Sequence, residues 1–93
     1  MTTTLENPGP LQLDGTALSS LDLGPVTVPY VDLVNAPYIH KRIKVGGAEY
    51  VWERTFPVRG GSAVMPAVVS ELLANGKKVL VAERGERYYV YLA

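Results

Sequence analysis

The sequence predicts an α+β fold in which one helix packs on a small antiparallel sheet, open or curled, made of two hairpins, and an extended N-terminal arm precedes them. Three observations lead to this fold: a strand-like alternation around Gly46–Gly47, one helical apolar stripe in residues 65–75, and a second pair of β-rich runs in residues 77–93. A helix on one face of an antiparallel sheet buries the apolar side of both elements. Ninety-three residues suit a single domain.

The first hairpin is predicted over residues 38–56. Apolar and basic side chains alternate in residues 38–45, as in a half-buried strand, and residues 48–56 return as the partner strand. Gly46–Gly47 between them is a dipeptide typical of tight hairpin turns. Strict alternation would place Tyr50, Trp52 and Arg54 on one face of the returning strand.

The only helix is predicted at residues 65–75. Its apolar stripe consists of Val68, Val69, Leu72 and Leu73. Pro66 suits the first helical position, and Asn75–Gly76 suits a left-handed stop. Residues 77–93 then predict the second hairpin, which turns at residues 83–86. Before the first hairpin, residues 26–34 have strand character, but Pro29 restricts them to a sheet edge or a bulge.

Residues 1–25 are predicted to be an extended docking arm, and residues 26–93 a compact α+β module. Residues 7–10 resist helix formation and ladder pairing, and Gly24–Pro25 ends the segment. The arm nevertheless contains leucines that need a surface to bury them, namely Leu11, Leu13, Leu18, Leu21 and Leu23. We expect these leucines to contact either the module of their own chain or a neighbouring subunit.

The formal net charge is zero, but the charges are distributed unevenly. Residues 1–37 carry four carboxylates and no Lys or Arg, whereas residues 38–93 carry nine Lys and Arg against five Glu, a difference of +4. An acidic arm that lies on a basic body is one interpretation, and a chance distribution of surface charge is the other.

The composition excludes several kinds of site. Without cysteine the chain has no thiol nucleophile, iron–sulfur cluster or cysteine-ligated zinc, and a cytoplasmic or virion location is favoured. No apolar run approaches the about 20 residues that span a bilayer, and the N-terminal residues lack the pattern of a signal peptide. We expect a soluble protein without membrane partner, cofactor, metal or catalytic residues.

Two weak motifs could bind small ligands. His40 is the only histidine, and because a metal site needs several ligands, a solvent-facing strand position is the better interpretation. A glycine-rich segment before the helix could hold an anion near the helix N-terminus, although an ordinary turn explains the same residues. This segment is Arg59, Gly60, Gly61 and Ser62.

Basic and aromatic side chains are interleaved on the first hairpin. The residues are Lys41, Arg42, Lys44 and Trp52. Such a surface resembles the stacking platforms that bind single-stranded nucleic acids. The sequence pI of about 6.6 disfavours a nucleic-acid partner.

The last predicted strand is rich in tyrosine. Tyrosine combines apolar area with a polar tip and suits protein interfaces. Tyr89 and Tyr91 are therefore candidates for subunit contact, and an amphipathic sheet surface is the plainer alternative.

We expect a non-enzymatic structural assembly protein that docks on neighbouring protein subunits through its arm, in a homo-oligomer or a larger assembly. By architectural analogy, a compact β-rich body with an arm resembles a small virion component of a tailed bacteriophage, such as a decoration, connector or tail subunit. Two alternatives stay open: a small inhibitor or adaptor, for example phage-encoded, that binds a host protein, and a nucleic-acid-binding accessory module.

Overall fold

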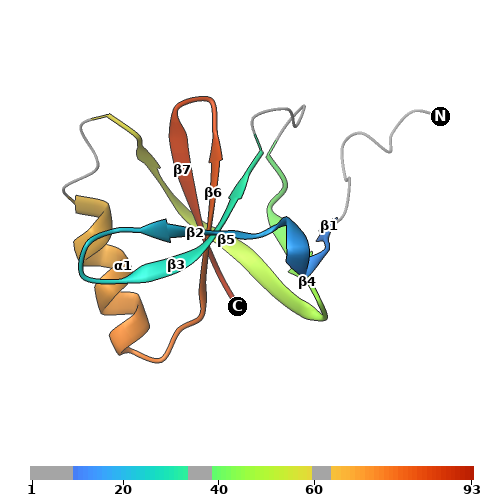
Figure 1. The fold of residues 1–93 in the computed structure, drawn as a ribbon, viewed down its shortest axis with the longest axis horizontal. Coiled ribbons are helices and arrows are strands. Elements are labelled where there is room, and N and C mark those ends of the chain that lie inside the picture. The colour runs from blue at the N-terminus through green and yellow to red at the C-terminus, as the bar shows by residue number, and fades with distance from the viewer. Residues whose placement is uncertain (1–9, 34–38, 60–63) are drawn as a thin grey trace.

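The computed structural model describes residues 10–33, 39–59 and 64–93. These residues form a seven-stranded mixed sheet, curled into a half-barrel, and one α-helix (Figure 1). Across the sheet the strands follow the order β1 (Leu11–Leu13), β4 (Arg42–Val45), β5 (Ala48–Pro57), β7 (Arg87–Leu92), β6 (Val79–Arg84), β3 (Thr27–Asp32) and β2 (Ser19–Asp22). The helix, α1, spans Val64–Ala74, and a short 3-10 turn, η2, spans Gly15–Ala17.

The predicted two-hairpin antiparallel sheet with an extended arm is wrong. Both hairpins exist, with turns at Gly46–Gly47 and Gly85–Glu86, but they form only the four central strands of the sheet. Three further strands come from residues 11–32, and two of the pairings they make, β1 with β4 and β3 with β6, are parallel. Parallel partners far apart in sequence leave no turn signal from which they could be predicted.

Both edges of the sheet come from one short segment of the chain. β1 pairs with β4 at one edge, β2 pairs with β3 at the other, and only residues 14–18 connect β1 to β2. In a flat sheet the two edge strands would lie about 29 Å apart, six spacings of ~4.8 Å. The six residue steps from Leu13 to Ser19 reach only about 20–22 Å at full extension. The sheet must therefore curl until its edges approach each other.

The curled sheet carries an apolar cluster on each face. On the helix face, Met65 and Val69 of α1 pack with buried strand residues, namely Val28, Val79, Val81 and Val90. The cluster on the opposite face consists of Val31, Leu33, Ile43, Leu80, Ala82 and Tyr91. Because β6 contributes to both clusters, residues 79–82 are buried on both faces.

The leucines of the predicted arm pack against their own chain. Leu11, Leu13 and Leu18 contact the cluster on the face opposite the helix, and Leu21 and Leu23 contact the helix-face cluster. All five are half-buried. The surface that these leucines bury is therefore the body of the same molecule.

The helix matches its prediction in position and in its stop. Gly76 has a φ of 83°, its N–H donates to the Leu73 carbonyl at 3.0 Å, and the Lys77 N–H donates to the Leu72 carbonyl at 3.1 Å. This pair of hydrogen bonds is the Schellman motif, which glycine favours. In the predicted apolar stripe, Val69 is fully buried and Leu72 is half-buried. Met65 is also fully buried, although it was not part of that stripe.

The burial of α1 predicts an order of stability losses. Met65→Ala leaves a cavity in the helix-face cluster and should lower the free energy of unfolding by about 2–5 kcal/mol. Leu72→Ala, at a half-buried position, should cost less than half of that. Chemical denaturation of both variants measures the two losses, and an equal or larger loss for Leu72→Ala would contradict this assignment of the core.

Candidate functional site

A β-bulge in β5 separates two side chains that strict alternation would place together. The register of β5 with β7 shifts between Trp52, which lies opposite Tyr91, and Arg54, which lies opposite Val90. Val90 belongs to the helix-face cluster, and Tyr91 belongs to the cluster on the other face. Trp52 and Arg54 therefore lie on opposite faces, and their predicted shared face is wrong. Bulges often re-aim a side chain in this way next to functional sites.

At the surface, the Trp52 side chain makes two contacts and its backbone makes a third. Its ring centroid lies 6.2 Å from that of Tyr89 with the planes tilted by 58°. Its Nε1–H donates to Thr55 Oγ1 at 3.0 Å, and its backbone N–H donates to the Lys41 carbonyl at 2.8 Å. The side chain is still 39% exposed. A fixed and partly exposed tryptophan beside a tyrosine can bury more apolar area against a partner without a large loss of side-chain entropy.

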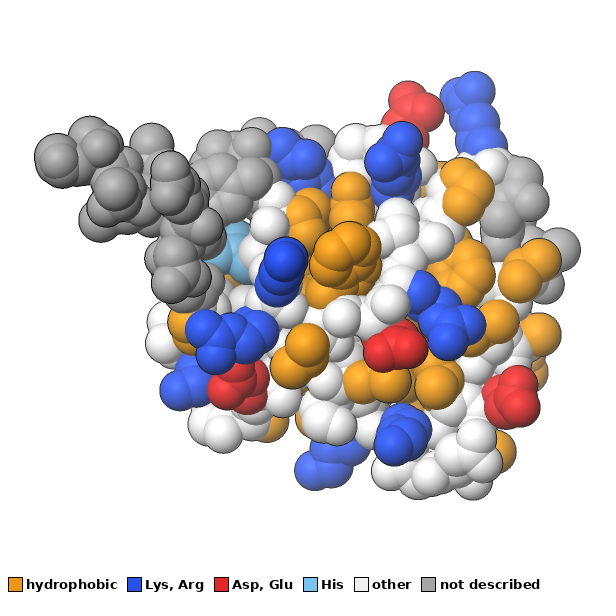
Figure 2. Space-filling view, turned by 180° about the vertical axis from the view of Figure 1, so that it is seen from behind, with side chains coloured by type: hydrophobic (Ala, Val, Ile, Leu, Met, Phe, Trp, Pro, Cys, Tyr) orange, Lys and Arg blue, Asp and Glu red, His pale blue; other side chains and the backbone are white. Residues whose placement is uncertain are grey.

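The surface of β5 is unusually open for a central strand. Residues 51–54 are all exposed, and Val51, on the helix face opposite Leu92, is 49% exposed. Seen from behind the view of Figure 1, hydrophobic side chains gather near the centre of the surface with Lys and Arg side chains around them (Figure 2). The openness of β5 makes its two faces the best candidates for contact with a partner.

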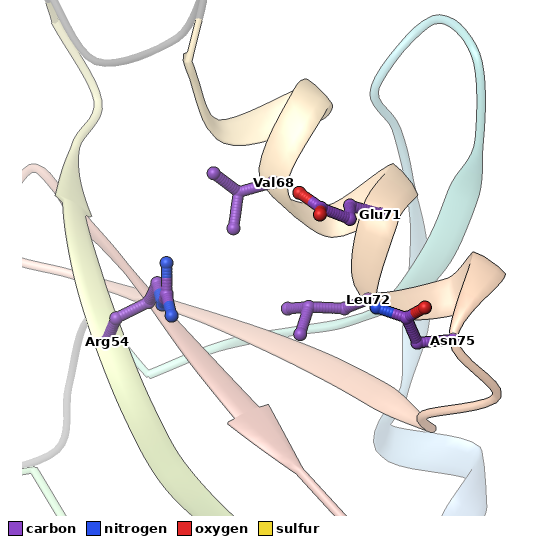
Figure 3. A pocket seen from close by; sticks show the side chains of 5 residues that line it. All are labelled: Arg54, Val68, Glu71, Leu72 and Asn75. Atoms are coloured by element: carbon purple, nitrogen blue, oxygen red, sulfur yellow. The ribbon is translucent and has the colours of Figure 1, made fainter.

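On the helix face, Arg54 lines a shallow pocket of about 240 Å³ between β5 and α1 (Figure 3). Val68 and Leu72 point from the helix toward β5 and form its apolar wall, while Glu71 of the helix and Asn75, directly after it, add polar groups. Arg54 also lies near Glu53, with 3.6 Å between Nη2 and Oε2, but both side chains are about half exposed. Such a pair contributes little to stability, so the Arg54 guanidinium can also bind a partner.

Residues of the predicted nucleic-acid surface lie on both faces of the sheet. The backbone carbonyl of Lys41, just before β4, accepts a hydrogen bond from the Trp52 N–H. Arg42 pairs in register with Val51 and therefore lies with Lys44 on the helix face. Trp52 therefore lies on the opposite face of the sheet from Arg42 and Lys44.

The two candidate interface tyrosines differ in burial. Tyr91 is fully buried, and its hydroxyl donates to the His40 carbonyl at 2.7 Å, which ties β7 to the segment before β4. Burial, followed by the negative potential of Tyr89, raises the pKa of Tyr91 to about 12. Tyr89 is half-buried beside Trp52. The described surface therefore presents Tyr89 and not Tyr91.

The anion motif is only partly placed. Arg59 is exposed in a turn after β5, and Gly60, Gly61 and Ser62 lie outside the described residues. Within the described ranges, no three His, Asp or Glu side chains are grouped so that they could hold a metal ion. The helices in these ranges also lack the length and apolar character that a membrane span requires.

A tyrosine–carboxylate pair links β3 to β6, and sequence reasoning missed it. The Tyr30 hydroxyl donates to Glu83 Oε1 at 2.6 Å. Burial and then this hydrogen bond raise the pKa of Tyr30 above its ordinary value, and burial and the charge of Glu83 raise that of Tyr88. Phenols with a raised pKa stay protonated near neutral pH, so they donate hydrogen bonds and do not act as bases.

No protein-family model, no curated protein and no solved structure matches this chain. The site is therefore interpreted from its own geometry.

The buried hydroxyl of Tyr91 predicts a loss of stability at alkaline pH. Its pKa is raised in the folded state, so its contribution is complete below the ordinary tyrosine value of about 10 and is lost as the pH rises toward about 12. Tyr91→Phe should cost about 0.5–1.5 kcal/mol at neutral pH, because the hydrogen bond is lost. It should also make stability fall less steeply between these pH values. Denaturant titrations of both proteins across this range test this, and identical slopes would contradict it.

Proposed function

We propose that this chain is a non-enzymatic structural assembly protein that binds neighbouring protein subunits through the surface around Trp52 and Tyr89. The observation that supports this proposal is the aromatic pair beside the β5 bulge, in which the partly exposed Trp52 packs on the half-buried Tyr89. Tryptophan and tyrosine are enriched among the residues that dominate binding energy at protein interfaces. A tryptophan that packed only for stability would bury more of its ring inside the half-barrel.

This proposal moves the docking surface away from the leucines of residues 11–23. These leucines are half-buried against their own chain, so they have less apolar area to offer a partner than a free arm would. The analogy with small virion subunits depended on such a free arm. The proposal therefore specifies a subunit contact and no particular assembly.

A small inhibitor or adaptor is the second candidate, and the same aromatic pair favours it. In such a protein, Trp52 would contact a different protein instead of a second copy, and the purified chain would be monomeric. Self-association of the pure chain thus separates the two functions.

Replacement of the exposed tryptophan tests the proposal. The pure chain should self-associate in sedimentation velocity runs at increasing concentration, and Trp52→Ala should weaken the association by about 30-fold or more, the effect of an interface hot spot of at least ~2 kcal/mol. Val64→Ala is the matched control, because Val64 is 54% exposed but lies at the start of α1. A monomeric wild-type chain, or equal losses in the two variants, would contradict the proposal.

A further inference from the structure

The aromatic pair and the α1–β5 pocket have complementary properties. Trp52 offers the exposed part of an electron-rich ring, and the pocket offers the Arg54 guanidinium beside the apolar walls of Val68 and Leu72. Arginine on the face of tryptophan is a favourable cation–π arrangement. Each surface therefore presents what the other would bind.

The size of the pocket favours a protein side chain as its occupant. A volume of about 240 Å³ corresponds to about eight water molecules at ~30 Å³ each. Pockets that enclose small-molecule ligands begin at about 300 Å³. The exposed part of one large side chain would cover this shallow pocket, and a typical small-molecule ligand would extend beyond it.

The bulge fixes how two copies could use these surfaces. Trp52 and Arg54 lie on opposite faces of β5, on either side of the register shift. Two copies related by a two-fold axis cannot insert both tryptophans into each other's pockets, because the ring and the pocket of one copy face in opposite directions. Copies can instead associate head to tail, an arrangement that leads to rings or filaments. With a formal net charge of zero, the copies do not repel each other.

We propose that the pocket between β5 and α1 binds Trp52 of a second copy of this chain in a head-to-tail contact. This inference rests on the proposed assembly function and adds the identity of the partner and the surface that receives the tryptophan. The contact uses different residues on the two copies, so each copy carries one ring to donate and one pocket to be filled.

A complementation experiment tests the head-to-tail contact. Trp52→Ala removes the ring and keeps the pocket, whereas Val68→Trp fills the pocket and keeps the ring. Each variant should sediment as a monomer, and an equimolar mixture should form a one-to-one dimer and nothing larger, because only one productive interface is possible. Val64→Trp, which adds the same side chain on the same helix outside the pocket, should assemble like the wild type. Far-ultraviolet circular dichroism and thermal unfolding verify that the variants are folded.

Three outcomes would overturn the inference. If Val68→Trp assembles like the wild type, or if the mixture stays monomeric while the wild type assembles, the pocket is not the receiving surface, although the proposed function stands. If the wild type is monomeric, both proposals fail.

Arg54 supplies an independent measurement. Arg54→Ala should weaken assembly by about 2- to 30-fold through loss of the cation–π contact, and Arg54→Lys should retain most of the affinity because it keeps a cation. Equal affinities for the wild type and Arg54→Ala would contradict a contact between this guanidinium and the tryptophan ring.

Discussion

The fold depends on one segment, residues 11–22, that supplies both edge strands of the sheet. β1 adds to β4 and β2 adds to β3, and the five residues between them are too few to cross a flat seven-stranded sheet. The curl follows from this constraint. So does the apolar cluster on the face opposite the helix, into which Leu18 packs from the connection of residues 14–18. Both edge strands of the described sheet are short, with three residues in β1 and four in β2, and short edges disfavour edge-to-edge pairing with other copies.

Elements with local signals were predictable from the sequence. The turn at Gly46–Gly47 and the helix with its stop at Gly76 follow from glycine conformation and apolar periodicity, and the structure has them where the sequence indicates. The second turn, predicted over residues 83–86, is confined to Gly85–Glu86, because Glu83 and Arg84 pair with β7 as part of β6. Residues 11–23 gave a weaker signal. Their leucines indicate burial, but nothing in the spacing says which surface receives them. The parallel partners, such as Leu11 with Ile43 and Tyr30 with Val81, are distant in sequence and have no connecting turn to reveal them.

The candidate site was only partly predictable for a related reason. Aromatic composition identified Trp52 and the tyrosines of the last strand. It did not show that Tyr91 is buried in the core while Tyr89 is partly exposed. Period-two alternation also failed at the bulge, since one extra residue moves Arg54 to the helix face. The bulge therefore gives β5 a ring on one face and a guanidinium on the other. Because the edge strands are short, a partner has more to gain from these side chains than from backbone pairing.

Native-state hydrogen exchange on two truncated chains tests most directly whether one segment holds both edges. Deletion of residues 1–13 removes β1, whereas deletion of residues 1–9 leaves all seven described strands intact and is the control. Without β1 the segment is released from β4 and the curl can open. The account predicts faster amide exchange in β4 and also in β2 and β3, which keep all their own pairing residues. If only the amides of β4 exchange faster, the two edges are held independently and the account is wrong.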